Sequence, residues 1–316
     1  MFDFLGVLLL LLLVFVLGWI TRRAWRAKRP VVKWLGTTLT GLLALVASVL
    51  LGAALFGYWK LNRTYNNPVP QLSVAVTPEH VARGERFAHL CAGCHAPDTG
   101  AAMTGRDFLA ESGPPIGDFY APNLTPVHLA YWSDGEIVRA IREGVHRSGR
   151  SLLIMPSSFW RTLSDEDVQA IVAYLRSLPA EGSETPPNRL NVLGAVMSLQ
   201  APIFAVQPPI TEPVVSPPVG PTAAYGAYVS SFTCEICHGS NLLGDPDSQA
   251  PPLVAIPLAW GEQEFIEFMR TGSRPDGSSV DGEAMPWKDL SRLLSGDDDL
   301  RAIYAHLQEE GAEYTR

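Results

Sequence analysis

Two long apolar runs open the chain, separated by a short basic stretch. The first, Phe4 to Ile20, has 17 uncharged residues, and the second, Trp34 to Trp59, has 26. At about 1.5 Å rise per residue, the first run with its flanks covers a hydrocarbon core of about 30 Å. The second run is long enough to span the core with some tilt. The pattern predicts a transmembrane hairpin anchor over residues 1–60.

The charges between the two runs predict the orientation of this hairpin. All six are basic: Arg22, Arg23, Arg26, Lys28, Arg29 and Lys33. The positive-inside rule places such a loop in the cytoplasm, so both ends of the chain face outward. Two alternatives stay open. The first run could be a cleaved signal peptide, although it lacks a basic start, and cleavage could also follow the second run near Ala54.

Four further segments follow the hairpin. Residues 61–76 are polar with two prolines and predict a short tether, and Thr77-Pro78 predicts the start of a helix. Nine prolines between Ser183 and Pro221 predict an extended linker over residues 181–221. Its apolar middle, Leu190 to Val206, is expected to lie against one of two flanking domains. These domains are predicted at residues 77–180 and 222–316.

The two predicted domains share an internal repeat of landmarks in the same order. The pairs are Ala121-Pro122 and Ala250-Pro251, Trp132 and Trp260, Arg142 and Arg270, Met155-Pro156 and Met285-Pro286, and the capping-box residues Ser164 with Asp167 and Ser295 with Asp298. Both copies are therefore predicted to end in a capped helix. The first copy carries a longer loop before its Ala-Pro element, including Met103 to Gly117.

All four cysteines lie in two C-x-x-C-H motifs, Cys91-Ala92-Gly93-Cys94-His95 and Cys234-Glu235-Ile236-Cys237-His238. This spacing is the signature of covalent haem attachment, because two thioethers reach one porphyrin while the adjacent imidazole binds the iron. A structural zinc ion would need a second ligand pair for each motif. The sequence therefore predicts two covalently attached haem c groups, with His95 and His238 as iron ligands.

A haem iron that only shuttles electrons needs a sixth ligand, and methionine in that position raises the reduction potential. Met155 and Met285 are the candidates, because they occupy matched positions in the repeat and each precedes a proline. A methionine in an apolar stretch is also ordinary core filler. Three others lack a counterpart and are expected to pack: Met103, Met197 and Met269.

Several other side chains are weaker candidates for haem contacts. Histidine ligation in place of methionine would use His128, His146 or His306, none of which has a counterpart in the other copy. Arg142 and Arg270 are candidates for the haem propionates, and Trp132 and Trp260 for packing on the porphyrin edge. Without any haem contact, the arginines could equally be solvated on a helix face and the tryptophans could equally pack in the core. The loop containing Met103 to Gly117 is expected over or beside the haem edge.

Charge narrows the choice of partners. Residues 65–316 carry 31 acidic and 16 basic side chains, a net charge of −15. Such a field disfavours nucleic acid and anionic surfaces and attracts a basic partner, although solubility alone is an equally good explanation.

The residues above resemble two class I cytochrome c domains, over about residues 77–180 and 222–310. Within that class, Gly84-Glu85-Arg86, Ala121-Pro122-Asn123-Leu124 and Trp132-Ser133-Asp134-Gly135-Glu136 are similar to the multihaem cytochrome subunits of periplasmic alcohol and aldehyde dehydrogenases. Those subunits typically carry three haem motifs and lack a two-span hairpin. The resemblance implies two small all-α domains, and together with the apolar runs it gives an all-α fold: an N-terminal two-helix transmembrane hairpin followed by two cytochrome c domains.

The resemblance implies an electron-transfer protein without catalytic residues. The apolar runs and the basic loop add the expectation that it is anchored in a bacterial cytoplasmic membrane with its haem domains on the periplasmic side. Haem attachment in the c-type family is extracytoplasmic, in agreement with the hairpin orientation. The expected partners are a donor dehydrogenase or quinol-oxidising complex and an acceptor cytochrome or oxidase. Two alternatives remain: a dihaem subunit of a larger oxidase or dehydrogenase, and a dihaem enzyme such as a peroxidase or thiosulfate dehydrogenase-like protein.

Overall fold

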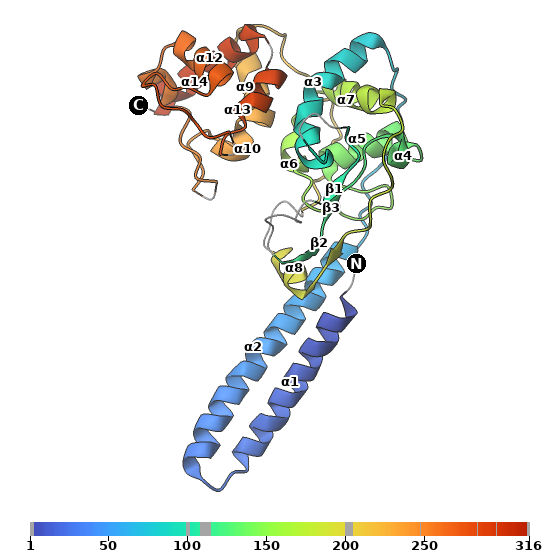
Figure 1. The fold of residues 1–316 in the computed structure, drawn as a ribbon, viewed down its shortest axis with the longest axis vertical. Helices are drawn as coiled ribbons and strands as arrows, with labels where there is room; N and C mark the ends of the chain where they lie inside the picture. The colour runs from blue at the N-terminus through green and yellow to red at the C-terminus, as the bar shows by residue number, and fades with distance from the viewer. Residues whose placement is uncertain are drawn as a thin grey trace.

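The computed structural model describes residues 3–98, 102–107, 115–199, 205–246, 248–282, 284–294 and 296–314. Its regular secondary structure is almost entirely helical (Figure 1), and each described strand is only two residues long. A long helical hairpin carries one small helical domain at its upper end, and a second helical domain lies beside the first. The expected all-α fold with an N-terminal hairpin is confirmed.

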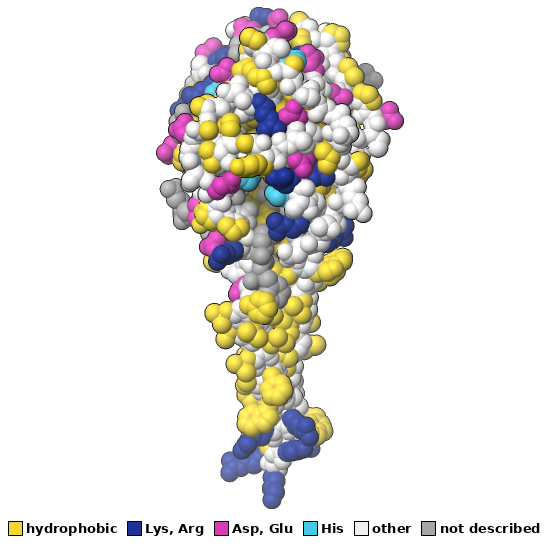
Figure 2. Space-filling view, turned by 90° about the vertical axis from the view of Figure 1, so that its right-hand side faces the viewer, with side chains coloured by type: hydrophobic (Ala, Val, Ile, Leu, Met, Phe, Trp, Pro, Cys, Tyr) yellow, Lys and Arg dark blue, Asp and Glu magenta, His cyan; other side chains and the backbone are white. Residues whose placement is uncertain are grey.

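The hairpin consists of α1 (Phe4–Trp25) and α2 (Pro30–Asn62), packed side by side. The Asp3 side chain caps α1 by accepting a hydrogen bond from the Gly6 amide at 2.8 Å, and Pro30 fits the first position of α2 because its missing amide proton would have no helical partner there. Both helices are long and apolar enough to cross a membrane. Figure 2 shows apolar side chains along the shaft and basic side chains at the end away from the domains.

Module 1 denotes residues 77–180. Its helices are α3 (Pro78–His95), α4 (Pro126–Leu129), α5 (Asp134–Glu143), α6 (Ser157–Trp160) and α7 (Asp165–Ser177). As predicted, α3 begins at Thr77-Pro78, where the Thr77 hydroxyl accepts from the His80 amide. Ser164 caps α7 by accepting from the Asp167 amide at 3.1 Å. The pair β1 (Arg106–Asp107) and β3 (Tyr120–Ala121) closes the loop between α3 and α4.

Module 2 denotes residues 222–316. Its helices are α9 (Ala223–Thr233), α10 (Glu235–His238), α11 (Ile256–Ala259), α12 (Glu262–Thr271), α13 (Trp287–Leu293) and α14 (Asp297–Tyr314). The packing of α9 on α14 repeats that of α3 on α7. Ser295, the expected cap of the last helix, lies outside the described residues. One apolar core cluster runs through both modules.

The described part of the apolar linker middle lies between module 1, in line with the expected contact with a domain, and the hairpin, a contact that the sequence did not predict. It forms α8 (Val192–Met197), which packs on α2. The Tyr58 hydroxyl donates to the Leu190 carbonyl at 3.1 Å, and the Lys60 ammonium donates to the Ser198 carbonyl at 2.7 Å. Because α2 presents Gly57 here, the α8 backbone approaches closely. Met197 is 42% exposed on α8, so its expected packing role is wrong.

The predicted tether, residues 61–76, is bound along module 1 over several residues. The Tyr65 amide donates to the Gly149 carbonyl at 2.8 Å. The Asn67 side chain donates to Glu143 at 2.6 Å, and the Asn67 carbonyl accepts from Arg139 at 3.1 Å. Polar side chains that looked like a solvated spacer in the sequence therefore fix module 1 to the end of α2.

The long loop of the first repeat also reaches this junction. Its strand β2 (Gly117–Asp118) pairs with β4 (Arg189–Leu190) of the linker. The Ile116 and Phe119 side chains form a small buried cluster with Leu61 and Leu190. Residues 108–114, the middle of this loop, lie outside the described residues. The described end of the loop thus joins module 1 to the anchor.

Candidate functional site

The first candidate site is built where α3 ends. His95 is the last residue of this helix, and its ring Nδ1 lies 2.8 Å from the Pro122 carbonyl oxygen. A carbonyl oxygen only accepts hydrogen bonds, so Nδ1 carries the proton and Nε2 keeps the lone pair that binds a metal. Burial lowers the pKa of His95 and favours the same neutral form.

The second candidate site repeats this arrangement in module 2. His238 ends α10, is buried, and has its Nδ1 2.7 Å from the Pro251 carbonyl oxygen. The repeated Ala-Pro element therefore has a role that the sequence did not reveal: its proline carbonyl orients the imidazole of each C-x-x-C-H motif. The signal was its matched position in both copies, because a backbone carbonyl leaves no mark of its own in a sequence.

The cysteines of both motifs are unbridged, and Cys234 is buried while the other three are partly buried. Cys91 and Cys234 lie in or against the apolar core cluster. Burial raises the pKa of the Cys91 thiol to about 12, so the thiol is neutral before any covalent attachment. In the described parts of the chain, no three His, Cys, Asp or Glu side chains converge on a metal position, so the zinc alternative has no ligand set there.

The two Met-Pro elements have the same backbone geometry. Pro156 has φ −79° and ψ 55°, and Pro286 has φ −78° and ψ 55°. The Ser157 amide donates to the Met155 carbonyl at 2.8 Å, and the Trp287 amide donates to the Met285 carbonyl at 2.7 Å. Each is an inverse γ-turn that opens a short helix. Both methionines are partly buried against the core, consistent with a shared role.

The candidate propionate arginines have other partners. Arg142 donates to the Asp165 carboxylate and to the Leu163 carbonyl, both at 2.5 Å. Arg270 donates to the Asp297 carboxylate at 3.1 Å and to the Leu294 carbonyl at 2.6 Å. Both arginines thus hold the start of the last helix of their module, so the geometry does not support the propionate role.

Trp132 is buried in the core of module 1 between two histidines. His128 has its Nδ1 2.7 Å from the Glu184 carboxylate. The His146 ring meets Trp132 edge to face at 4.8 Å between centroids, and its Nδ1 accepts from the Ser148 amide at 3.1 Å. Burial, with help from nearby arginines, lowers the pKa of His146 to about 4. In module 2, Trp260 is partly buried, and its ring meets that of Phe268 at a tilt, with centroids 5.0 Å apart.

The residues at both sites fit a haem c group. Two free thiols stand next to an imidazole whose orientation is fixed by a backbone carbonyl, which is the outer-shell contact that iron-binding histidines use. Apolar core side chains line the same region and would keep water from the iron.

Comparison with known proteins agrees with this interpretation. Residues 81–179 match the family described as cytochrome c. The chain is 30% identical over 241 residues to a nicotinate dehydrogenase subunit from Pseudomonas putida, covering 69% of this chain and 20% of that protein. It is 26% identical over 281 residues to the cytochrome c subunit of a quinone alcohol dehydrogenase from Gluconacetobacter polyoxogenes, covering 75% of this chain and 58% of that protein.

A diheme cytochrome c-type protein of Cereibacter sphaeroides is 27% identical over 308 residues, covering 86% of this chain and 97% of that protein. The chain spans a fifth of the nicotinate dehydrogenase subunit and less than two thirds of the alcohol dehydrogenase subunit. The relatives named as cytochrome c subunits are electron carriers of dehydrogenases. The chain therefore carries a cytochrome c domain at residues 81–179 and is related to the cytochrome c electron-transfer subunits of dehydrogenases.

Proposed function

We propose that this protein is a membrane-anchored dihaem cytochrome c that passes electrons from a dehydrogenase or quinol-oxidising donor to a respiratory acceptor. The observation that carries the proposal is the duplicated site. His95 and His238 close equivalent C-x-x-C-H motifs, and each ring is oriented by the proline carbonyl of an equivalent Ala-Pro element. The similarity to a diheme cytochrome c-type protein over almost its whole length supports two haem groups.

Each haem c group, when bound, supplies an iron that gains or loses one electron. Cys91 and Cys94 would form its thioether bonds in module 1, and Cys234 and Cys237 in module 2. His95 and Met155 would bind the iron in module 1, and His238 and Met285 the iron in module 2. The matched Met-Pro turns favour the same ligation at both irons, which suits a carrier better than an enzyme with an open iron.

The hairpin would hold the protein in the membrane with both modules on the periplasmic side. Its two helices are long and apolar enough to span a bilayer, and the turn between them carries the basic residues that mark a cytoplasmic loop. Because α8 and residues 61–76 bind module 1 to the upper end of α2, this module would stay close to the bilayer surface. That position suits an exchange of electrons with a membrane-bound partner.

The donor proposed here is a dehydrogenase, since several relatives are named as cytochrome subunits of alcohol, gluconate and fructose dehydrogenases. The net charge of −15 over residues 65–316 favours a partner with a basic docking surface. Association with such a partner should therefore weaken as the salt concentration rises.

The test is to express the chain in a bacterium with a haem c attachment system and to count covalent haem in the membrane fraction. We expect two haems per chain, one after Cys94→Ala, one after Cys237→Ala, and two in the matched control Ser231→Ala. A single haem in the unmodified chain, or an unchanged count in either cysteine variant, would refute the dihaem assignment. Recovery of the haem-loaded chain in the soluble fraction would refute the anchor.

A further inference from the structure

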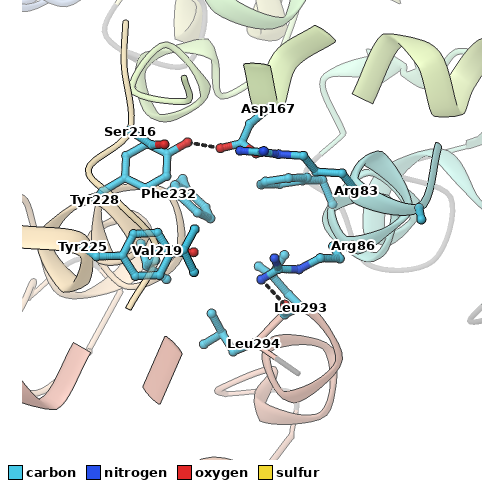
Figure 3. A pocket seen from close by; sticks show the side chains of 13 residues that line it. Arg83, Arg86, Asp167, Ser216, Val219, Tyr225, Tyr228, Phe232, Leu293 and Leu294 are labelled. Atoms are coloured by element: carbon cyan, nitrogen blue, oxygen red, sulfur yellow. Dashed lines mark hydrogen bonds and ion pairs between the residues drawn. The ribbon is translucent and has the colours of Figure 1, made fainter. Parts of the chain in front are cut away.

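The two modules meet where α3 of module 1 packs on α13 of module 2 and where α9 of module 2 contacts α6 of module 1. Figure 3 shows this contact, with Arg83 and Arg86 extending from α3, and Tyr225 and Tyr228 extending from α9. The Tyr228 hydroxyl of module 2 donates to the Asp167 carboxylate of module 1. In the opposite direction, the Arg86 guanidinium of module 1 donates to the Asp299 carboxylate of module 2 at 3.0 Å. Each module thus contributes one donor and one carboxylate.

These two contacts are equivalent in the internal repeat. Arg86 lies two residues after Gly84, and Tyr228 lies two residues after Gly226, the glycines at the two helix crossings. Asp167 and Asp299 each lie three residues before the alanine whose carbonyl faces that glycine, so the structural counterpart of Asp167 is Asp299 and not Asp298, with which the sequence paired it. The same position of each module therefore binds the same position of the other. Such reciprocity is the hallmark of a two-fold interface, here formed within one chain.

Each carboxylate is also held inside its own module, again by equivalent residues. Arg83 donates to Asp167 from its Nε at 2.7 Å, and Tyr225, one helical turn before Tyr228, lies beside Asp299. Both aspartates are only 5% exposed. A buried carboxylate that lost its partners would be strongly destabilising, so these bonds restrict where the modules can sit.

Tyr228 fits the start of α7 closely. Its oxygen accepts a hydrogen bond from the Ser164 amide at 2.9 Å, while its proton goes to Asp167. Burial, together with the Asp167 charge, raises the pKa of Tyr228 well above its usual value, so the hydroxyl stays protonated and remains a donor. The side chain of module 2 thereby completes the capping contacts of a helix in module 1.

The rest of the contact is mainly apolar and is loosely filled. The rings of Phe87 and Phe232 meet with centroids 5.7 Å apart, and the Ser231 hydroxyl lies 3.0 Å from the Thr162 hydroxyl. A cavity of about 330 Å³ remains between the modules. Because apolar packing is incomplete here, it specifies the relative position of the modules weakly. The reciprocal polar contacts have to supply that specificity.

The interface lies next to both haem motifs in the chain. Phe87 is one helical turn before Cys91 on α3, and Phe232 is two residues before Cys234. A movement at this contact would therefore be passed directly to the ends of α3 and α9, where the motifs begin.

We infer that the pairs Tyr228–Asp167 and Arg86–Asp299 form a reciprocal clamp that fixes the two C-x-x-C-H motifs relative to each other. These four are positioning residues for the passage of one electron from one module to the other, a step in which no bond is made or broken. This inference rests on the proposed dihaem function, since a fixed separation matters only if both motifs carry haem.

The test uses the full haem-loaded chain in detergent, with nitroxide labels introduced at Tyr131→Cys and Leu258→Cys, which are exposed in modules 1 and 2. The clamp variant is Arg86→Gln with Tyr228→Phe. The matched control is Arg301→Gln with Tyr304→Phe, which removes an arginine and a tyrosine hydroxyl whose partners lie within module 2. Pulsed dipolar spectroscopy gives the distance distribution between the labels in the reduced protein. Flash photoreduction gives the rate of electron exchange between the modules.

We expect one narrow distance distribution in the unmodified chain and the control, and a broad one in the clamp variant. The exchange rate of the clamp variant should fall by at least about tenfold, because the hydrogen bonds that Tyr228 and Arg86 make across the contact are lost, including the one from the charged Arg86 guanidinium to Asp299. The haem content and both reduction potentials should stay unchanged. An unchanged distribution, or a broad distribution with an unchanged exchange rate, would overturn the inference.

If the double variant does not accumulate, Tyr228→Phe alone removes one oxygen atom and should still broaden the distribution; an unchanged distribution there would count against the clamp. The label distances also separate this inference from the proposed function. If the unmodified chain carries only one haem, the dihaem proposal is contradicted. If the distance distribution still broadens in the clamp variant of that chain, the clamp itself is supported.

Discussion

Gly84 lies directly against the carbonyl oxygen of Ala170, where α3 crosses α7. A Cβ atom at Gly84 would overlap this oxygen, which belongs to the backbone and cannot move aside as a flexible side chain could. Gly226 meets the carbonyl of Ala302 in the same way where α9 crosses α14. The two modules are therefore assembled around the same close helix crossing, which only a residue without a side chain permits.

Substitution of either crossing glycine should destabilise its own module. We expect Gly84→Ala to lower the free energy of unfolding by about 1–3 kcal/mol, because overpacking forces the two helices apart. The measurement is the midpoint of urea unfolding of the haem-loaded chain, with haem absorbance as the signal that reports unfolding. Gly18→Ala is the control, since nothing lies within 4 Å of a Cβ atom there. Equal midpoints for Gly84→Ala and the control would show that the crossing tolerates a methyl group.

Sequence reasoning predicted the features that depend on local patterns. The apolar runs predicted α1 and α2, Thr77-Pro78 predicted the start of α3, and Ser164 predicted the cap of α7, and all of these are confirmed. These features are readable because caps and membrane spans depend on residue type at fixed spacing.

The contacts between distant segments could not be predicted in this way. Residues 61–76 looked like a free tether because hydrogen bonds such as the one from Tyr65 to the Gly149 carbonyl use backbone atoms, which every residue has. The approach of α8 to Gly57 likewise depends on tertiary position. The ligand roles of Met155 and Met285 stay predictions, supported by matched backbone turns.

The methionine assignment predicts a specific spectroscopic loss. Met155→Ala and Met285→Ala should each remove about half of the weak sulfur-to-iron absorption band of the oxidised protein and lower the reduction potential of one haem, because thioether ligation raises that potential. Met197→Ala, on α8, should leave both properties unchanged. A full band in Met155→Ala would exclude Met155 as a ligand, and the search would then turn to the histidines of module 1.

Because the pKa of His146 is lowered in the folded chain, we expect the folding stability to depend on pH. Its folded-state pKa of about 4 lies below the unfolded value near 6.5, mainly because the ring is buried. Between these values the unfolded chain binds a proton that the folded chain does not, so folding stability falls as the pH drops from about 7 towards 4. Protonation would also remove the acceptor that Nδ1 offers to the Ser148 amide. Since the ring is partly exposed, we expect a loss of only about 1 kcal/mol.

The measurement for His146 is the urea-derived stability of the full chain at pH 7 and pH 5, compared with that of His146→Gln. Glutamine keeps an acceptor and does not titrate, so the variant should lose about 1 kcal/mol less than the unmodified chain over this interval. His80→Gln serves as the control, because His80 is exposed at the start of α3. Parallel pH profiles for His146→Gln and the unmodified chain would contradict the assignment.

The seating of α8 on the hairpin predicts a proteolytic phenotype without loss of the membrane anchor. In Gly57→Val, the new side chain would overlap the Ala195 carbonyl and displace α8, while α2 gains an apolar residue and keeps its capacity to span the bilayer. Trypsin should then cleave after the exposed Arg189 at least about tenfold faster, because local opening governs such cleavage. Gly52→Val, where a Cβ atom meets nothing within 4 Å, should cleave at the unmodified rate. Equal cleavage rates for the two variants would show that the packing of α8 on α2 does not protect the linker. The hydrogen bond from the Tyr58 hydroxyl to the Leu190 carbonyl would then be the next contact to remove.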